Sequence, residues 1–320
     1  MRPLIILTGP TAVGKTALSL RLAKAIGGEI ISADSMQVYR GMDIGSAKIT
    51  KEEMMGIPHH LIDVLDPREE FNVTVFQAMA KAAVEEIYSR GRIPIVAGGT
   101  GFYIQALLND IDFTETGEDS SIRTELEKIA EEKGAAHLHE MLLMIDPESA
   151  EQIHANNVKR VIRAIEFYRQ TGERISKHNK RERQKESPYD FLYFVVNTDR
   201  DTLYQRIDQR VDQMVEQGLV EEVKRLKASG CTRDMVSMQG LGYKEILDYL
   251  QGEYSLEEAL YLIKRDTRHF AKRQITWFKR EKDVRWLNLP DYGYDLDKVL
   301  EKMIIDISER YGLENKATWK

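Results

Sequence analysis

The chain begins with a short apolar run that leads into a glycine-rich loop and then into a segment with helical periodicity. The run is Pro3-Leu4-Ile5-Ile6-Leu7, and the loop is Gly9-Pro10-Thr11-Ala12-Val13-Gly14-Lys15-Thr16. A strand, the pattern G-x-x-x-x-G-K-[ST] and a helix in this order predict a phosphate-binding loop. Backbone N–H groups there face an anion, Lys15 adds a positive charge, and the Thr16 hydroxyl can hold Mg²⁺. The loop alone does not distinguish ATP from another diphosphate ester.

Strand and helix patterns alternate through the first hundred residues. We expect strands at 4–7, 29–33 and 93–97 and helices at 16–26 and 76–89. This alternation predicts an α/β fold with a parallel, doubly wound sheet flanked by helices. Ligands in such sheets bind at the carboxyl ends of the strands. The loop, Asp34 after the second strand and Gly98-Gly99-Thr100-Gly101 after the third should therefore line one crevice.

The pattern changes to helices from about residue 113 and returns to strand character at 191–196. Helices are expected at 122–133, 135–144, 147–154 and 158–171, before a charged run at 177–186. Further helices are expected at 202–229, 243–250 and 256–280, with a short strand at 284–287. We therefore predict a core domain formed by residues 1–112 and 188–320, with an inserted all-helical domain at 113–187.

The composition excludes several classes of protein. An apolar fraction of 42% is enough for a substantial core, and the net charge of −6 gives no global sign of nucleic-acid binding. The single cysteine, Cys231, excludes an internal disulfide and a thiolate zinc cluster. No apolar stretch is long enough to span a membrane, and the first apolar run is too short for a signal peptide. A cytoplasmic protein that contacts no membrane is expected.

Asp34 is the main candidate for a catalytic group. At the end of the second strand its carboxylate should lie beside the phosphate-binding loop, as a general base or as a ligand of hydrated Mg²⁺. A helix N-cap is the structural alternative, and the position favours catalysis. The glycines at 98–101 allow a ligand to approach the backbone closely, and a plain turn is equally compatible with them. The third strand ends without an acidic residue, which argues against a motor ATPase or a switch GTPase.

Arg206 and Arg210 share one face of a predicted helix and suit a departing diphosphate, because a guanidinium holds two oxygens at once. Sequence alone favours the alternative, a solvated face on which they pair with Asp208 and Asp212. His59-His60 and Asp63 resemble a metal cluster, but adjacent histidines on a strand point to opposite faces, which favours a structural role.

Three basic segments contrast with the acidic total. They are 177–186, 264–285 and the helix face of Lys159, Arg160 and Arg163. The second contains His269, Phe270, Trp277 and Phe278 among its basic residues, a mixture that suits a phosphate backbone with unstacked bases. Each segment alone fits an ordinary solvated helix equally well. Together they favour RNA.

Several motifs in order along the chain resemble those of the tRNA dimethylallyltransferase family. They are the phosphate-binding loop, Ile31-Ser32-Ala33-Asp34-Ser35-Met36-Gln37-Val38-Tyr39, Met42-Asp43-Ile44-Gly45-Ser46-Ala47-Lys48, Pro58-His59-His60-Leu61-Ile62-Asp63, Val96-Ala97-Gly98-Gly99-Thr100-Gly101-Phe102-Tyr103, Lys159-Arg160-Val161-Ile162-Arg163-Ala164-Ile165-Glu166, Gly240-Leu241-Gly242-Tyr243-Lys244 and Lys272-Arg273-Gln274-Ile275-Thr276-Trp277-Phe278. The loop alone is not specific, whereas the combination is.

The resemblance implies transfer of a dimethylallyl group from dimethylallyl diphosphate to N6 of adenosine 37 in a tRNA. It implies a P-loop NTPase-like core in which the loop, Thr16 with Mg²⁺ and Arg210 hold the diphosphate. Asp34 would take the amine proton, with Thr100 positioning that amine.

The resemblance also implies that the insertion grips the anticodon stem-loop, in a monomer without an obligate protein partner. The implied tRNA-contacting residues are Asp34, Ser35, Met36, Gln37, Thr100, Arg123, Lys159, Arg160, Val161, Ile162, Arg163, Gln239, Gly240, Leu241, Gly242, Tyr243 and Lys244.

Two other functions remain as alternatives. A small-molecule P-loop kinase or an adenylate isopentenyltransferase would share the loop, but a free nucleotide requires neither the insertion nor the basic segments. A non-catalytic RNA-binding protein would not require an intact Lys15, Thr16 and Asp34.

Overall fold

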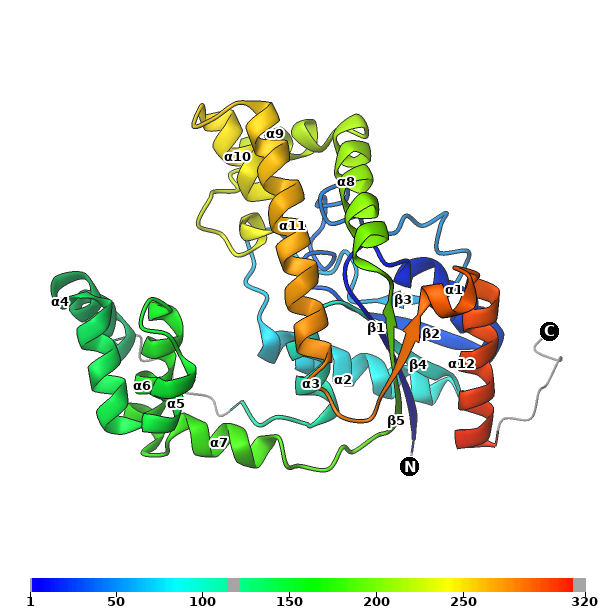
Figure 1. Ribbon diagram of the computed structural model, residues 1–320, viewed down its shortest axis with the longest axis horizontal. Coiled ribbons are helices and arrows are strands. Elements are labelled where there is room, and N and C mark those ends of the chain that lie inside the picture. Colours follow the sequence, from blue (N-terminus) through cyan, green and yellow to red (C-terminus); the bar gives the residue numbers. More distant parts are fainter. Residues whose placement is uncertain (1, 114–120, 313–320) are drawn as a thin grey trace. The chain divides into compact units, whose positions relative to one another are not determined.

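The computed structural model describes residues 2–113 and 121–312, and the chain forms two compact units (Figure 1). Unit 1 comprises Met1–Leu107 and Tyr189–Lys320, and unit 2 comprises Leu108–Pro188. The sequence places the insertion at 113–187, and residues 114–120 of that range lie outside the described residues.

A six-stranded parallel sheet forms the centre of the described part of unit 1. Its strands are β1 (Pro3–Thr8), β2 (Gly28–Ala33), β3 (His59–His60), β4 (Ile93–Gly98), β5 (Asp190–Asn197) and β6 (Val284–Asn288). The spatial order is β3-β2-β4-β1-β5-β6, so chain neighbours are separated by crossovers. The predicted α/β class is confirmed. The expected strands formed, and the two-residue β3 was not predicted.

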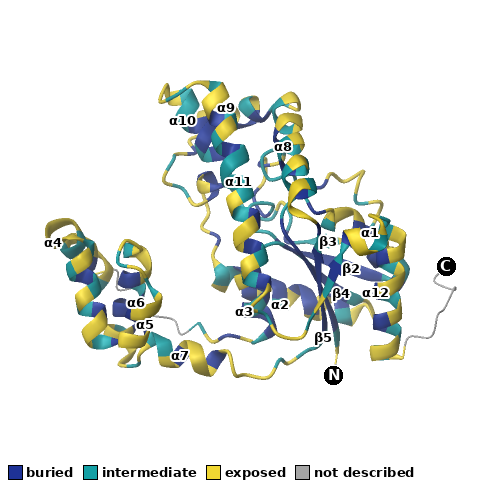
Figure 2. Ribbon diagram, viewed as in Figure 1, coloured by how far each residue is buried: buried dark blue, intermediate teal, exposed yellow. Residues whose placement is uncertain are grey.

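Helices cover both faces of this sheet (Figure 1). The helices of unit 1 are α1 (Lys15–Ile26), α2 (Val73–Ser89), α3 (Gly101–Leu108), α8 (Arg200–Glu216), α9 (Leu219–Ala228), α10 (Tyr243–Gln251), α11 (Leu256–Phe278) and α12 (Leu296–Tyr311), with short 3₁₀ helices at Ser237–Gln239 and Leu289–Tyr292. One buried cluster joins Ile5 of β1 to Leu18 of α1 and Met303 of α12. The four inner strands β1, β2, β4 and β5 and the inner helix faces are mostly buried, whereas the edge strands β3 and β6 are partly exposed (Figure 2).

The single helix predicted at 202–229 is wrong, because α8 and α9 are separate helices. Gly218 lies between them with φ of 103° and is the N-cap of α9. A left-handed backbone of this kind ends helical continuity and favours glycine. Helical periodicity on both sides of the break conceals it in the sequence.

Unit 2 is all-helical over its described residues. It contains α4 (Ser121–Ile145), α5 (Pro147–Gln152), α6 (Val158–Thr171) and α7 (Ile175–Glu182). Gly134, with φ of 85° and ψ of 162°, kinks α4 between the two helices predicted there. Leu126, Leu142 and Val161 are among its buried core residues. The charged run at 177–186 is largely helical because α7 buries His178 and Glu182 and exposes its basic side chains.

The carboxyl ends of the central strands are level with one another. Gly98 of β4 is in register with Thr8 of β1 on one side and Ala33 of β2 on the other. The segments that follow these three residues therefore leave the sheet at one edge. Within the described residues, none of the helices combines the length and apolarity needed to cross a membrane.

Candidate active site

The loop after β1 has the backbone geometry of an anion site. A side chain on Gly9 would place its Cβ 2.2 Å from the Val196 carbonyl oxygen, so only glycine fits there. Gly14 has φ of 104° and is the N-cap of α1. Because the first N–H groups of a helix have no helical acceptor, those of Lys15 and Thr16 are available to a ligand. Thr16 is exposed at this helix start.

The Lys15 side chain folds over the loop. Its Nζ donates to the carbonyl oxygens of Gly9 at 3.0 Å and Pro10 at 2.8 Å. Burial and the nearby positive charge of Arg210 lower the pKa of Lys15 to about 7, against the opposing effect of Asp34. A bound anion would favour the charged form of Lys15.

Asp34 lies where the sequence predicts, directly after β2. Its Oδ1 accepts hydrogen bonds from the backbone N–H of Met36 at 2.8 Å and of Gln37 at 3.3 Å. Asp34 caps a turn, because no helix of the described structure begins there. No described residue donates a hydrogen bond to Oδ2, so this oxygen can accept one from a substrate.

The turn after β4 is tied to the end of β2. The N–H of Thr100 donates to the Ala33 carbonyl at 3.2 Å, and Thr100 is half-buried. The glycines around it serve protein packing: a Cβ on Gly99 would lie 2.1 Å from Gln274 Nε2, and one on Gly101 would lie 2.2 Å from Trp277 Cδ1. The close approach that we considered for a ligand at Gly99 and Gly101 is thus made by side chains of α11.

The two arginines of α8 have different environments, and the predicted pairing with Asp208 and Asp212 is wrong. Asp208 pairs with Arg268 at 2.8 Å, and Asp212 pairs with Lys264 at 2.6 Å. Arg206 Nη1 donates to the Val13 carbonyl of the loop at 3.4 Å. Arg210 forms no ion pair or hydrogen bond with any described residue. Burial lowers its pKa, and Asp34 is its opposing charge.

Lys15, Asp34 and Arg210 therefore form one electrostatic group at the carboxyl edge of the sheet. They come from α1, the end of β2 and α8, and two of them are desolvated cations. A desolvated cation without an anionic partner is costly, which makes this group a site for an added anion.

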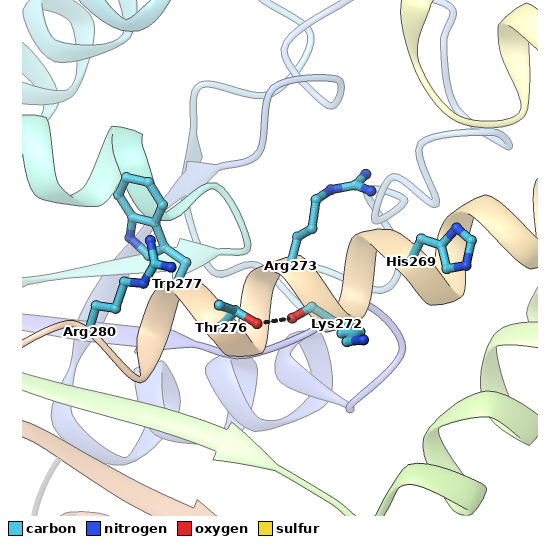
Figure 3. Close-up of a pocket in the computed structure, with 6 residues that line it drawn as sticks. All are labelled: His269, Lys272, Arg273, Thr276, Trp277 and Arg280. Carbon is cyan, nitrogen blue, oxygen red and sulfur yellow. Dashed lines mark hydrogen bonds between the residues drawn. The ribbon is translucent and has the colours of Figure 1, made fainter. Parts of the chain in front are cut away.

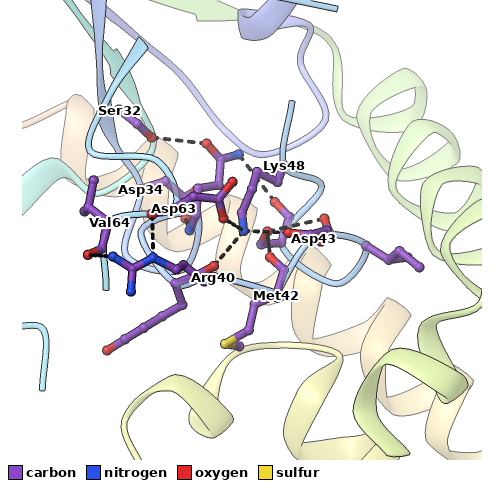
Figure 4. A network of polar contacts seen from close by, with 12 residues as sticks. Ser32, Asp34, Arg40, Met42, Asp43, Lys48, Asp63 and Val64 are labelled. Carbon is purple, nitrogen blue, oxygen red and sulfur yellow. Dashed lines mark hydrogen bonds and ion pairs between the residues drawn. The ribbon is translucent and has the colours of Figure 1, made fainter. Parts of the chain in front are cut away.

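The segment that carries Asp34 is held by a buried lysine (Figure 4). Lys48 Nζ contacts Asp43 Oδ1 and the Tyr39 carbonyl at 2.6 Å each, and it pairs with Asp63 Oδ1. Its side chain is only 3% exposed, whereas those of the two aspartates are about half exposed. One buried cation thus joins two points of the loop between β2 and β3, at Tyr39 and Asp43, to Asp63 just after β3.

A buried carboxylate holds the same segment from the other side. Glu222 of α9 accepts the backbone N–H groups of Asp43 at 3.0 Å, Ile44 at 2.8 Å and Gly45 at 3.1 Å. The Tyr243 hydroxyl donates to it at 2.8 Å. Sequence reasoning missed Lys48 and Glu222 as structural groups of the site, because burial of a charged side chain leaves no local pattern.

The tRNA-binding candidates of unit 1 lie on adjacent segments. A Cβ on Gly240 would be 2.7 Å from Met36 Sδ, so segments 34–37 and 239–244 are adjacent. Gln239 and Ser35 have accessible side chains, whereas Tyr243 is fully buried. The Gln37 amide is already bonded to Ser32 and to the carbonyl oxygens of Ser46 and Ala47. Leu241 and Lys244 are half-buried, and Gly242 is buried.

The candidates of unit 2 cluster on α4 and α6. Lys159 and Arg160 are exposed and form no ion pair with a described residue. Arg123 of α4 donates to Glu166 Oε2 at 2.7 Å, and Arg163 is 3.8 Å from the same oxygen. Val161 and Ile162 belong to the core of the unit, so contacts from this segment fall to its basic members.

α11 has a buried and a basic face. Figure 3 shows His269, Lys272, Arg273, Thr276, Trp277 and Arg280 around a hollow of about 430 Å³. Lys272, Arg273 and Arg280 are exposed and form no ion pair with described residues, whereas the preceding Arg268 is neutralised by Asp208. The buried face carries Ala271, Gln274 and Phe278. The basic face fits the interpretation as an RNA-binding segment, and the buried face fits the interpretation as an ordinary solvated helix. Each interpretation therefore describes part of this segment.

The histidines of β3 have structural partners, as predicted. His60 Nε2 contacts Glu29 Oε2 at 2.9 Å, and His59 Nδ1 contacts the Ile57 carbonyl at 2.8 Å. Across the described ranges, no group of three or more acidic, histidine or cysteine side chains could hold a metal ion. An Mg²⁺ ion that enters with a diphosphate needs few protein ligands, and the exposed Thr16 hydroxyl fits that requirement.

The fold and this candidate site define an α/β protein in which a glycine-rich loop and a carboxylate lie at the same edge of a parallel sheet. The family model described as IPP transferase matches residues 37–281. A tRNA dimethylallyltransferase of Lachnoclostridium phytofermentans is 62% identical over 97% of this chain and 99% of its own. The chain belongs to the tRNA dimethylallyltransferase family.

Solved structures agree with this assignment. A full-length tRNA isopentenylpyrophosphate transferase from Bacillus halodurans is 45% identical, with a TM-score of 0.73 over 98% of this chain and 99% of that one. A eukaryotic dimethylallyltransferase acting on tRNA is 32% identical, with a TM-score of 0.83 over 97% of this chain and 79% of that one.

Proposed function

We propose that this protein transfers the dimethylallyl group of dimethylallyl diphosphate to N6 of adenosine 37 in tRNAs. The observation that carries the proposal is the meeting of Lys15, Asp34 and Arg210 at one edge of the sheet. Two desolvated cations suit a diphosphate, and a carboxylate beside them suits an amine that must lose a proton. Such a substrate implies a cytoplasmic enzyme, and one chain supplies every residue of the proposed site.

The leaving group would be bound by the loop. The N–H groups at the start of α1, Lys15 and Arg210 hold the diphosphate as negative charge develops on it. Arg206 positions the loop through the Val13 carbonyl. Thr16 would hold the Mg²⁺ ion that accompanies the diphosphate and adds positive charge to the leaving group.

Asp34 would act on the nucleophile. The bond between C1 of the dimethylallyl group and the diphosphate oxygen breaks, and its electrons leave with the diphosphate. The N6 amine forms the new bond to C1, and one N6 proton goes to the Asp34 carboxylate. Since Met36 and Gln37 occupy Oδ1, we assign the proton to Oδ2. Thr100, joined to Ala33, would position the amine.

RNA binding would use the exposed cations. Lys272 and Arg273 on α11, Arg280 just after it, and Lys159 and Arg160 in unit 2 are exposed and would contact phosphates. Arg123 and Arg163, which already contact Glu166, would contribute beside that carboxylate. Trp277 in the hollow of Figure 3 is suited to base stacking. The adenine must leave its stack to reach Asp34, as enzymes that modify bases require. We propose that segments 34–37 and 239–244 receive the displaced nucleotide and that unit 2 contacts the anticodon stem-loop.

A single experiment separates this function from its alternatives. The full chain is incubated with Mg²⁺, an anticodon stem-loop RNA or AMP as acceptor, and labelled dimethylallyl diphosphate or γ-labelled ATP as donor. We expect label from dimethylallyl diphosphate in the RNA at the adenosine 3′ of the anticodon. Label in AMP alone indicates an adenylate isopentenyltransferase, and label transferred from ATP indicates a kinase. Either result would overturn the proposal.

A further inference from the structure

Gln274 connects two of the three loops at the active edge of the sheet. It lies on the buried face of α11 and is 6% exposed. Its Oε1 accepts the backbone N–H of Thr11 in the phosphate-binding loop at 2.9 Å, and its Nε2 donates to the Gly99 carbonyl at 2.9 Å. The ends of β1 and β4 are already joined at Thr8 and Gly98, and Gln274 adds a side-chain link further out, between Thr11 and Gly99.

An amide satisfies both contacts at once. The Thr11 N–H can only donate and the Gly99 carbonyl can only accept, so one group must offer an acceptor and a donor side by side. These partners also fix which end of the amide faces which loop. Gly99 has no side chain because a Cβ there would lie 2.1 Å from Gln274 Nε2. The contact therefore depends on both residues, because only a glycine at position 99 leaves room for the Gln274 amide.

The third loop is joined to the same chain of contacts. Thr100, next to Gly99, donates its N–H to the Ala33 carbonyl, and Asp34 follows Ala33. A continuous path therefore runs from Thr11 through Gln274, Gly99 and Ala33 to Asp34. It joins the loop that would bind the leaving group to the carboxylate that would take the proton.

The amide also determines which loop N–H groups face the ligand. Because Thr11 donates to Gln274, its N–H is directed toward α11 and away from an anion at the start of α1. Removing this acceptor would leave the half-buried Thr11 N–H without its partner and free the loop to move. The backbone N–H groups of Lys15 and Thr16 would then no longer be held in position by the contact from α11.

We propose that Gln274 is a positioning residue that sets the spacing between the diphosphate loop and the turn carrying Thr100. The inference rests on the proposed function, because it needs a diphosphate donor and a proton-accepting Asp34. Gln274 touches neither reacting group. It acts on both through the backbone, so its loss should raise the KM for dimethylallyl diphosphate as well as lower kcat.

The test compares Gln274→Leu with Gln77→Leu in the full chain. Gln77 of α2 is also a buried glutamine, 8% exposed, and its Nε2 donates to the Ala106 carbonyl of α3 at 2.7 Å. We measure KM and kcat for dimethylallyl diphosphate, the Kd of inorganic diphosphate by calorimetry, the Kd of a stem-loop RNA, and the melting temperature. A merely structural role lowers the folded fraction, which reduces kcat without changing KM.

For Gln274→Leu we expect KM and the diphosphate Kd to rise about tenfold, the effect of a lost buried hydrogen bond. The RNA Kd should change by less than about twofold, because the exposed cations are intact. Gln77→Leu should lower the melting temperature by a similar amount and leave KM unchanged. A Gln274→Leu enzyme whose KM and diphosphate Kd equal the wild-type values would overturn the inference.

Gln274→Glu keeps the test decisive if the leucine variant does not fold. A protonated glutamic acid offers the same donor and acceptor as the amide, whereas the ionised form cannot donate to the Gly99 carbonyl. The defect relative to wild type should therefore be smaller at pH 6 than at pH 8, and equal defects at the two pH values would contradict the inference. If wild type transfers no prenyl group while its diphosphate Kd still depends on Gln274, the proposed reaction fails and the positioning role stands.

Discussion

The Lys15 ammonium of α1 and the Arg210 guanidinium of α8 lie close enough that Arg210 helps to lower the pKa of Lys15. Burial is the larger cause, and together they bring this pKa to about 7. Arg210 is itself desolvated and has no ion partner among the described residues. Two like charges are thus held together in a site that an anion would neutralise.

Diphosphate binding should weaken as the pH rises through this pKa. A bound diphosphate raises the pKa of Lys15, so the complex holds a proton that the free enzyme loses above about pH 7. We expect the affinity for inorganic diphosphate to fall between pH 6 and pH 9, with proton uptake on binding near pH 8. Calorimetry in two buffers of different ionisation enthalpy measures both quantities.

Lys15→Arg is the control for this titration. An arginine stays charged over the whole range, so the pH dependence that remains in this variant belongs to the ligand and to other groups. Identical pH profiles for wild type and Lys15→Arg would show that Lys15 does not titrate in the site.

Unliganded stability has the opposite pH dependence. Since the folded-state pKa of Lys15 lies below its unfolded value, the unfolded chain binds more protons between about pH 7 and 10. The contribution of Lys15 therefore destabilises the fold at pH 7 and disappears as the pH rises through that window. Lys15→Met should raise the melting temperature at pH 7 while abolishing diphosphate binding, which thermal unfolding with and without diphosphate would show. A melting temperature below that of wild type would contradict this account.

Asp34→Asn should separate proton transfer from structure. Its side-chain oxygen can still accept the N–H groups of Met36 and Gln37, so the turn is kept, but the amide cannot take a proton. We expect kcat to fall by about 10²–10⁴-fold, the usual contribution of a general base. RNA affinity, measured by filter binding, should stay within about threefold. In Asp34→Ala the turn contacts are lost as well, and transfer should be abolished with RNA binding largely spared. Full activity in either variant would remove Asp34 from the mechanism.

Arg210 and Arg206 should differ in their kinetic effects. Arg210→Gln removes a cation that forms no ion pair with a described residue, and we expect kcat/KM for dimethylallyl diphosphate to fall by about 10²–10³-fold. Arg206→Gln removes one contact to the Val13 carbonyl, and we expect a loss of about tenfold or less. Steady-state kinetics with saturating RNA measures both variants. The reverse order of effects would exchange the roles that we assign to the two arginines.

The sheet was predictable because its strands are short apolar runs that end at glycine or polar residues. Periodicity indicates whether a segment is a helix or a strand, but it does not show where a helix is interrupted. The helical pattern is continuous across Gly218, although the chain there divides into α8 and α9. α3 and α12 were not predicted, although both are amphipathic or apolar segments of ordinary length. The register that brings Gly98 level with Thr8 and Ala33 follows from the parallel arrangement.

The loop and Asp34 could be located from the sequence because both follow strands directly. The ion pairs of α8 could not, because Asp208 pairs with Arg268 and Asp212 with Lys264, both on α11 and more than 50 residues further along the chain. The same holds for Gln274, whose two contacts lie far away in the sequence. Sequence spacing suggests ion-pair and hydrogen-bond partners that are close along the chain. The observed partners are determined by how the helices pack.

Glu222→Gln should destabilise the loop that follows Asp34. Glu222 is buried and accepts three backbone N–H groups and the Tyr243 hydroxyl, whereas a glutamine would turn an NH₂ group toward some of these donors. We expect a loss of about 2 kcal/mol in the free energy of unfolding, the usual effect of buried donors left unpaired, and a lower kcat. Urea unfolding measures the first and prenyl transfer the second. Glu221→Gln is the matched control, because the neighbouring Glu221 is 69% exposed and pairs only with Lys224 at 2.7 Å. Such a surface pair contributes at most about 1 kcal/mol, so equal losses in the two variants would contradict the anchoring role of Glu222.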